Sequence, residues 1–247
     1  MMRGKLKLLE LRIKLVKRLL NLTGFKQISG HWIYVPKINK ASVVIDLGAN
    51  RGNFSKKMVK EFSVSCYAVE PDINLFKEIN LPGISKYNYA ISKNNGPVSF
   101  FISNNDEASS LIKDFQSNWA NKGEHLVEGV TWELLIQHLN LTQKKISILK
   151  VDIEGSELDL IDSFTSDNIS LVEQITIEFH DWINNSLHER TLFAIKKLIS
   201  LQFMAVSNTP DHSWPVEILF INKKAIQFNY FKRILLSVYQ KLTFLHY

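Results

Sequence analysis

The segment VVIDLGANRG, residues 43–52, constrains the fold of this chain more than any other stretch. A run of β-branched apolar residues ends at Asp46, and Gly48 and Gly52 bracket the turn that follows. Glycine suits such a turn because a residue without a Cβ atom adopts positive φ and lets a ligand approach the backbone. The segment therefore predicts a buried strand, a glycine turn and a helix, the arrangement typical of nucleotide-binding α/β proteins.

The spacing D-x-G-x-x-x-G differs from the G-x-G-x-x-G spacing of dinucleotide-binding proteins. This looser turn has no phosphate to hold, and it suits S-adenosylmethionine, whose amino-acid end can lie over the backbone. We expect Asp46, Gly48, Ala49, Asn50 and Gly52 to form that part of a cofactor site. Taken alone, the ten residues are also compatible with an ordinary strand–turn–helix unit that binds nothing.

Length and composition fit one large α/β domain with short appendages. The chain has 247 residues, of which 45% are hydrophobic and 11% aromatic, and this is enough apolar material for a packed core. Its single cysteine, Cys66, excludes an internal disulfide and a thiolate metal cluster. We expect a buried thiol there, because Cys66 lies in an apolar run, and cysteine usage favours a cytoplasmic location.

The net charge of +6 hides an uneven distribution along the chain. Residues 1–26 contain eight lysines and arginines and one acid, and residues 223–247 contain five and no acid. Residues 27–222 contain 17 basic and 23 acidic residues. We therefore predict a basic N-terminal helix (1–26), a central domain (27–222) and a basic C-terminal segment (223–247). The acidic body argues against a nucleic-acid partner.

Both basic ends carry apolar residues at helical spacing. Over residues 5–22, leucine, isoleucine and valine recur every three or four positions. Lysine or arginine interrupts each apolar run, so neither a membrane span nor a signal peptide is expected. Two interpretations stay open: peripheral attachment to the anionic inner face of a membrane, or packing on the domain or in a homodimer interface.

Between the ends, strand and helix patterns alternate. Strands are predicted at 43–46, 64–69, 84–89, 97–102, 146–151, 172–179, 203–207 and 216–221, and helices at 53–62, 72–79, 131–139, 156–164 and 187–200. This alternation predicts an α/β fold, a mostly parallel sheet with helices on both faces, whose last two strands are antiparallel. Turn-forming residues at about 92–129 predict an insertion at the carboxyl-end rim of the sheet, where binding loops lie.

Glu70 ends the second predicted strand, about twenty residues after the glycine turn. A carboxylate at this place can accept hydrogen bonds from both ribose hydroxyls of a nucleoside. Pro71 fixes the backbone that follows, and Ala90, after the third strand, is expected to lie against an adenine ring. The alternative for Glu70 is a purely structural charge near the start of the next helix.

Two groups of ionisable residues occur where later apolar strands end. Lys150, Asp152 and Glu154 share one face by β-strand alternation, and so do Glu178 and His180. Because neighbouring parallel strands end at one edge of a sheet, we expect the acids and the histidine to line one pocket beside the methyl donor. A solvated strand end is the alternative.

In this order, the motifs resemble the FkbM-type family of S-adenosylmethionine-dependent methyltransferases from about residue 42 to residue 220. VVIDLGANRGNFS is similar to the family's cofactor loop, YAVEPD to its acidic second-strand end, EASSLI to its serine pair, KVDIEGSEL to its K-x-D-x-E-G-x-E signature and ITIEFH to its E-x-H strand. Trp132 and Glu133 depart from the usual Leu-Asp pair, which we expect to affect packing more than chemistry. The resemblance implies a Rossmann-like class I methyltransferase fold with a seven-stranded sheet.

The resemblance also implies methyl transfer, usually to a hydroxyl of a sugar, a glycan or another small metabolite. A hydroxyl is a weak nucleophile at neutral pH, so we expect His180 to act as its base, with Asp152 as the alternative. Lys150 is expected to stabilise oxyanion charge or to keep its acidic neighbours ionised. Asp152, Glu178 and His180 would also suit Mg²⁺ or Mn²⁺, and the sequence does not separate the two versions.

Ser109 and Ser110 in the insertion, together with Glu154, are expected to contact the substrate. The basic ends would suit a lipid-linked glycan made at a membrane. Two other protein classes remain as alternatives. A NAD-dependent oxidoreductase is opposed by the missing G-x-G-x-x-G motif, and a non-catalytic membrane-surface scaffold by the intact cofactor loop and the acid–histidine cluster.

Overall fold

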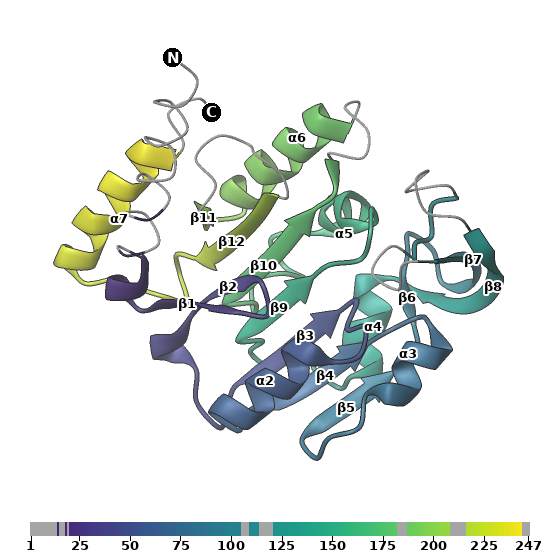
Figure 1. Ribbon diagram of the computed structural model, residues 1–247. Helices are drawn as coiled ribbons and strands as arrows, with labels where there is room; N and C mark the ends of the chain where they lie inside the picture. Colours follow the sequence, from purple (N-terminus) through teal and green to yellow (C-terminus); the bar gives the residue numbers. More distant parts are fainter. Residues whose placement is uncertain are drawn as a thin grey trace.

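A computed structural model describes residues 20–104, 109–113, 121–181, 187–207 and 216–243, with residues 14 and 18 as single positions before them. For residues 121, 122 and 237–243 it describes the backbone alone. A seven-stranded sheet forms the centre of the molecule (Figure 1). In spatial order its strands are β11 (Phe203–Ser207), β12 (Val216–Asn222), β10 (Gln174–Phe179), β9 (Ile148–Val151), β3 (Val43–Leu47), β4 (Ser65–Val69) and β5 (Ile84–Tyr87).

Strand β12 is antiparallel to both of its neighbours, β10 and β11. The pairs β10–β9, β9–β3, β3–β4 and β4–β5 are parallel. This topology confirms the prediction of a mostly parallel seven-stranded sheet with an antiparallel last strand. It also places the carboxyl ends of β3, β4, β9 and β10 at one edge.

The two faces of the sheet are covered differently. Helices α4 (Trp132–His138), α5 (Glu157–Ser163) and α6 (Leu187–Ser200) pack on one face through the largest apolar cluster. On the other face, α2 (Asn53–Phe62) packs beside a β-hairpin, and α3 (Ile73–Glu78) follows β4. The five helices predicted from the sequence are confirmed. Cys66 is 1% exposed on the α2 face, as expected, and burial raises the pKa of its thiol.

The insertion forms a second, three-stranded sheet in the order β6-β8-β7. Its strands are β6 (Ala90–Ile91), β7 (Gly96–Ser103) and β8 (Asn121–Val130). The predicted strand at 97–102 is therefore real but belongs to this separate sheet. Turn-rich sequence around it concealed β8, in which residues 124–126 are all exposed and no apolar alternation marks a strand. The small sheet stands beside the end of the main sheet (Figure 1).

A hairpin of β1 (Phe25–Ile28) and β2 (His31–Tyr34), which the sequence analysis did not predict, precedes the main sheet. It is fixed to the sheet by side chains rather than by strand pairing. The amide of buried Gln174 accepts from Tyr34 N at 2.7 Å and donates to Tyr34 O at 3.1 Å. The Glu217 carboxylate accepts from Trp32 N. These bonds hold the hairpin across β10 and β12.

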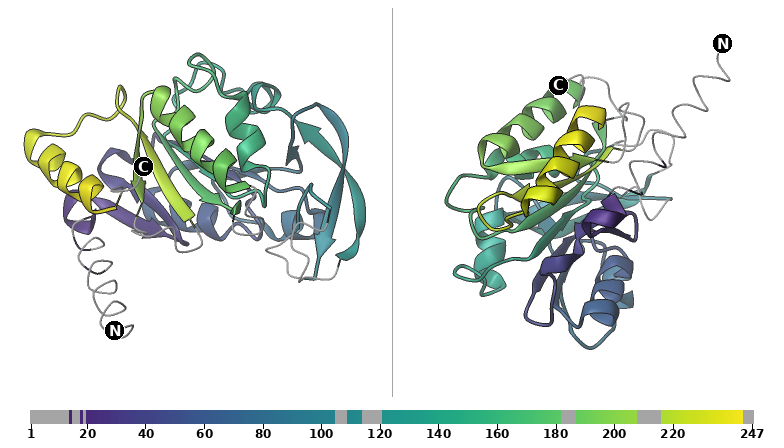
Figure 2. Two further views of the ribbon diagram at one scale, coloured as in Figure 1. Left: turned by 90° about the horizontal axis from the view of Figure 1, so that it is seen from above. Right: turned by 90° about the vertical axis from the view of Figure 1, so that its left-hand side faces the viewer.

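Both basic ends contribute to one apolar cluster with the hairpin and the β11–β12 edge. Figure 2 shows the C-terminal helix on this side of the molecule. From the N-terminal segment, Leu20 is 1% exposed, and Leu236 of α7 (Tyr230–Thr243) is 3% exposed. The remaining members are Phe25, Trp32, Tyr34, Val206, Leu219, Ile221 and Ile226. Packing thus continues across the boundaries predicted at 26 and 222. Most of the helix predicted over residues 5–22 lies outside the described residues. Among the described helices, none is long and apolar enough to cross a membrane.

Candidate active site

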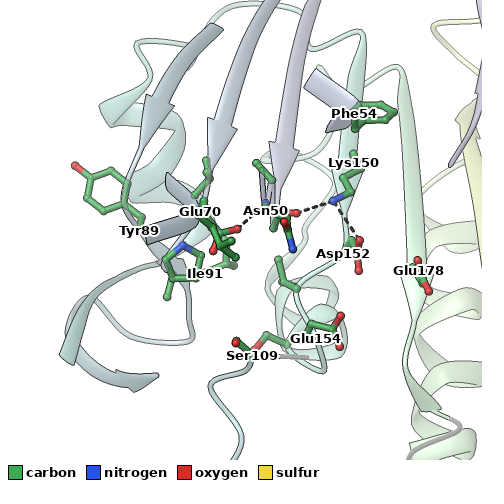
Figure 3. A pocket seen from close by; sticks show the side chains of 18 of the residues that line it. Asn50, Phe54, Glu70, Tyr89, Ile91, Ser109, Lys150, Asp152, Glu154 and Glu178 are labelled. Carbon is green, nitrogen blue, oxygen red and sulfur yellow. Dashed lines mark hydrogen bonds and ion pairs between the residues drawn. The ribbon is translucent and has the colours of Figure 1, made fainter. Parts of the chain in front are cut away.

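A cavity of about 500 Å³ lies at the carboxyl ends of β3, β4, β9 and β10 (Figure 3). Most of the residues singled out from the sequence line it: Gly48, Ala49, Asn50, Glu70, Pro71, Ala90, Ser109, Lys150, Asp152, Glu154 and Glu178. Four others lie next to it without lining it: Asp46, Gly52, Ser110 and His180. The strand ends therefore meet as the parallel sheet requires.

The loop after β3 approaches its neighbours so closely that glycine is required. Gly48 has φ of +71°, and a Cβ atom there would lie 1.7 Å from the carbonyl oxygen of Asp152. The amides of Gly48 and Ala49 both donate to Val69 O at 3.0 Å. Gly52, with φ of +73°, is the N-cap residue of α2. The loop backbone is thereby pressed against β4 and β9 at the rim of the cavity.

Glu70 holds this loop in place from the end of β4. Its carboxylate accepts from Asn50 N at 2.7 Å and from Asp72 N at 2.8 Å. Burial raises the pKa of Glu70 to about 7, although both N–H donors oppose the shift. Each carboxylate oxygen keeps a second lone pair, so these bonds leave acceptor capacity toward the cavity.

The cavity changes from apolar at one end to acidic at the other. Tyr89, Ala90 and Ile91 line the apolar end, beyond Glu70 (Figure 3). The insertion reaches the cavity through Ser109, whose hydroxyl accepts from Ser103 N at 3.1 Å. The adjacent Ser110 hydroxyl donates to Glu154 O at 2.6 Å, so it positions the loop after β9.

Lys150 is a buried cation between the glycine loop and the acidic end. Its Nζ donates to Gly48 O at 2.7 Å and lies 3.2 Å from Asp46 Oδ1 and 3.3 Å from Asp152 Oδ2. Burial alone would lower the pKa of Lys150, but Asp152 and Asp46 raise it above its ordinary value. Asp46 is fully buried and also accepts from Ser55 Oγ at 2.6 Å. Asp46 therefore supports the cavity floor instead of facing a ligand.

Three carboxylates form the acidic end: Asp152, Glu154 and Glu178 (Figure 3). Burial would raise the pKa of Asp152, but Lys150, His31 of β2 and His180 hold that pKa well below its usual range. Burial raises the pKa of Glu154 to about 7 and raises that of Glu178 as well. One ionised carboxylate therefore stands between two whose proton affinity is increased.

His180 lies behind this acidic group, between Glu154 and a further carboxylate, that of Glu157. Its Nδ1 is 2.9 Å from Glu157 Oε1, and its Nε2 is 3.4 Å from Glu154 Oε2. Burial would lower the pKa of His180, but Glu157 and Glu154 raise it well above its ordinary value. A protonated imidazole has no lone pair to accept a proton. The role of base, for which the sequence favours His180, does not suit this placement.

Asp152, Glu178 and His180, the metal ligands suggested by the sequence, do not converge as one group. Asp152 and Glu178 instead meet His31, from the hairpin, and Asp152 and Glu154 meet His180. His31 was not predicted as a site residue, because the short runs FKQI and HWIY, on either side of Ser29 and Gly30, give too weak a strand pattern to indicate a hairpin. That Ser-Gly pair between apolar runs is the signal that could have revealed it.

The sequence from residue 46 to residue 199 matches the model of the methyltransferase FkbM domain. The chain belongs to the FkbM methyltransferase family. No curated protein matches it.

Three solved structures are reported as similar to this FkbM methyltransferase. They are a precorrin-6y C5,15-methyltransferase from Geobacter metallireducens (11% identity, TM-score 0.39, covering 75% of this chain and 81% of that chain), an rRNA methylase from Streptococcus thermophilus (10%, 0.43, 75% and 89%), and a human methyltransferase 10 domain-containing protein (12%, 0.39, 85% and 80%).

The cavity of the FkbM methyltransferase fits S-adenosylmethionine, the cofactor expected for such an enzyme. Its volume of about 500 Å³ suits a ligand of that size. The glycine loop would allow close backbone approach, Glu70 would accept from ribose hydroxyls, and Tyr89 with Ile91 would provide apolar surface for the adenine. The protein is thus an S-adenosylmethionine-dependent methyltransferase.

Proposed function

We propose that the protein methylates a hydroxyl oxygen of a sugar, a glycan or another small polyhydroxylated metabolite. One observation carries the proposal: Asp152, Glu154 and Glu178 face a single cavity next to the glycine loop. Carboxylate oxygens accept hydrogen bonds, so a group of three carboxyl side chains suits an acceptor with several hydroxyls. S-adenosylmethionine, when bound, supplies an electrophilic methyl group.

Glu154 is the proton acceptor in this proposal. It lines the cavity, and its pKa of about 7 is matched to proton transfer near neutral pH. Asp152, whose pKa is held low, is a weaker base, but it stays ionised and can orient the acceptor through a hydrogen bond. His180 acts through Glu154 as a positioning residue, since its imidazolium lies between Glu154 and Glu157.

The experiment measures methyl transfer from labelled S-adenosylmethionine to a panel of nucleotide sugars, glycans and small polyols. Products are identified by mass spectrometry and compared with extracts of cells that lack the protein. We expect Glu154→Gln to lower kcat about 10²- to 10⁴-fold while S-adenosylhomocysteine binding is unchanged. Transfer only to nitrogen or carbon acceptors, or full activity of Glu154→Gln, would contradict the proposal.

His180→Gln separates positioning from direct catalysis. The imidazolium lowers the pKa of Glu154, so its removal should raise that pKa further. The acidic limb of the kcat/KM profile is then expected to move to higher pH, with measurable activity remaining. A complete loss of activity at every pH would instead make His180 the base that the sequence favours.

We also propose that α7 attaches the protein to an anionic membrane surface. Its outward side chains include Tyr230, 81% exposed, and Phe231, 68% exposed. Lys223, Lys224 and Arg233 are exposed around them. Aromatic groups flanked by cations suit the boundary between acyl chains and anionic headgroups. Such attachment would place the cavity near a lipid-linked glycan.

Liposome co-sedimentation tests this attachment. We expect the full chain to bind vesicles rich in phosphatidylserine and not neutral vesicles, with binding weakened by salt. Phe231→Ser should reduce binding, whereas Phe193→Ser, an exposed phenylalanine on α6, serves as the control. Salt-independent binding, an equal loss in the control, or dimerisation through α7 without vesicle binding would contradict it.

A further inference from the structure

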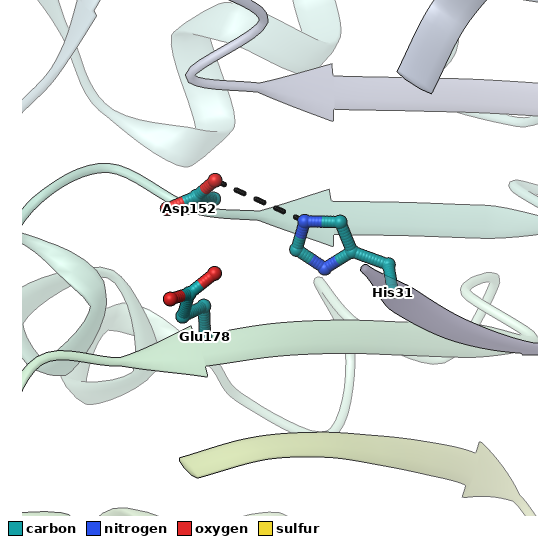
Figure 4. Close-up of side chains that lie close together, drawn as sticks. All are labelled: His31, Asp152 and Glu178. Atoms are coloured by element: carbon teal, nitrogen blue, oxygen red, sulfur yellow. Dashed lines mark ion pairs between the residues drawn. The ribbon is translucent and has the colours of Figure 1, made fainter. Parts of the chain in front are cut away.

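Three side chains from separate elements meet at the acidic end of the cavity (Figure 4). His31 comes from β2 of the hairpin, Asp152 follows β9, and Glu178 belongs to β10. One ligand atom of each lies within 4.8 Å of those of the other two. His31 is outside residues 46–199, the part that matches the family model.

The polar contacts of the buried His31 imidazole with Asp152 and Glu217 are both long, at 3.8 Å. His31 is 4% exposed, and its Nδ1 has no hydrogen-bond partner among the described residues. Its Nε2 points toward Asp152, but the distance to Oδ2 is 3.8 Å, beyond hydrogen-bond range (Figure 4). A buried imidazole normally uses its nitrogens, because an unpaired polar group costs free energy. Nε2 of His31 is therefore aimed at the carboxylates of Asp152 and Glu178, which both line the open cavity.

The other side of the imidazole also has the surroundings of a metal ligand. Nδ1 of His31 faces Glu217 Oε1 at 3.8 Å. Glu217 is held by Trp32 N and by the Thr176 hydroxyl, which donates to it at 3.2 Å. Histidines that bind metals usually donate their second N–H to a carboxylate, which fixes the tautomer and the ring orientation. Glu217 stands where that carboxylate would be.

We propose that His31 Nε2, Asp152 and Glu178 bind one divalent cation of the Mn²⁺ class. One imidazole and two carboxylates suit an ion that accepts both nitrogen and oxygen ligands. Their ligand atoms, which lie within 4.8 Å of one another, would surround an ion at coordination distances of about 2.0–2.2 Å. Three protein ligands leave coordination positions open toward the cavity. Where the proposed hydroxyl methylation holds, the ion coordinates the acceptor hydroxyl and lowers its pKa.

The test measures Mn²⁺ binding directly, without methyl donor or acceptor, so it does not depend on the proposed methyl transfer. Electron paramagnetic resonance of free Mn²⁺ gives affinity and stoichiometry, and pulsed measurements detect coupling of a coordinated histidine nitrogen. We expect one ion per full-length chain, with nitrogen coupling. His31→Gln should lose the coupling and weaken binding at least about tenfold, and Glu217→Gln should weaken it about 10- to 100-fold.

Two further variants make the result decisive. His188→Gln changes a half-exposed histidine on α6 and should leave Mn²⁺ binding unchanged. His180→Gln removes the histidine of the neighbouring group and should keep the nitrogen coupling, which identifies His31 even if His31→Gln folds poorly. The proposal is overturned if the native protein binds no Mn²⁺, if His31→Gln binds it normally, or if the coupling disappears only in His180→Gln.

Discussion

At the scale of single residues, Lys150 organises the charges of the site. Its ammonium group pairs with one carboxylate below the cavity, Asp46, and one that lines it, Asp152. The same group bonds the backbone of the glycine loop. A buried ion pair gives little net stability, but removal of one partner leaves uncompensated buried charge.

We therefore expect Lys150→Met to lower the free energy of unfolding by about 3–5 kcal/mol. The methionine fills a similar volume, but it leaves Asp46 and Asp152 without their cation. Urea unfolding followed by circular dichroism measures the change. Lys144→Met, at an exposed position, is the control and should differ little from the native protein. A loss below about 1 kcal/mol would show that water or protonation compensates the carboxylates.

Glu70 connects loop order to cofactor affinity. In Glu70→Gln the side-chain amide can accept at one oxygen only, so one of the N–H groups of Asn50 and Asp72 loses its acceptor. We expect S-adenosylhomocysteine binding to weaken by about 1.5–3 kcal/mol, the value of a charged hydrogen bond. Isothermal titration calorimetry measures this, with Glu189→Gln, an exposed carboxylate on α6, as the control. Unchanged affinity would remove Glu70 from the cofactor site.

Gly48 is required for a steric reason that the turn motif alone does not reveal. The Cβ of Gly48→Ala would lie 1.7 Å from a backbone oxygen, which cannot move as a flexible side chain can. We expect loss of cofactor binding together with a marked fall in melting temperature. Gly96→Ala is a matched control, because its φ is also positive but no atom lies within 4 Å of the added Cβ. Equal melting temperatures for the two variants would refute the steric argument.

At the scale of elements, the sequence predicted the alternating strands and helices of the main sheet, but not the β1–β2 hairpin or strand β8. Apolar strands such as 43–46 and helices such as 187–200 were found because burial imposes a period of 2 or 3.6 residues. The hairpin was missed because its strands have four residues each and owe their position to Gln174 and Glu217, far along the chain.

The same distinction explains the site. Motifs on strand ends predicted which acids line the cavity, because alternation and parallel topology place those ends together. The environment of His180 was not predictable in this way. Glu157 is the first residue of α5, and the packing of α5 against β10 brings it to the imidazole. His31 belongs to the hairpin, which is not part of the main sheet, so the positions of the strand ends do not predict where it lies.

Gln174 is the residue that binds the hairpin element to the sheet. Both atoms of its buried amide are paired with Tyr34, so Gln174→Leu leaves one N–H and one carbonyl of the hairpin unpaired. We expect a loss of about 1–3 kcal/mol in the free energy of unfolding and faster amide exchange in β2. Hydrogen exchange measured by mass spectrometry locates the effect. Exchange raised equally in β5, at the opposite edge, would argue against a local role.

At the scale of the whole molecule, buried carboxyls and His180 make stability depend on pH in one direction. Burial raises the pKa of both Glu70 and Glu217 from 4.5 to about 7. Between these values the folded protein keeps protons that the unfolded chain has lost, so this stability falls as the pH rises through 7. The raised pKa of His180 acts in the same sense. The lowered pKa of Asp152 matters only in strong acid.

We therefore expect the melting temperature, measured with EDTA present, to be higher at pH 5.5 than at pH 8 by several degrees, about the shift that 1–2 kcal/mol produces. Unfolding at pH 6 should release protons, which appears as a dependence of the unfolding enthalpy on the buffer. Glu217→Gln should flatten the dependence. A melting temperature that rises from pH 5.5 to 8 would contradict these pKa directions.

The attachment of the hairpin also determines when the enzyme becomes complete during its synthesis. β2 leaves the ribosome early, but the side chains that hold it follow 140 residues later, at Gln174, and 185 residues later, at Glu217. The glycine loop and its neighbouring strands can assemble before Glu217 is synthesised, but the hairpin that carries His31 is not yet fully attached. A nascent or truncated chain that ends before β12 therefore has the glycine loop for the methyl donor, but it lacks Glu217, which helps to hold the hairpin that carries His31.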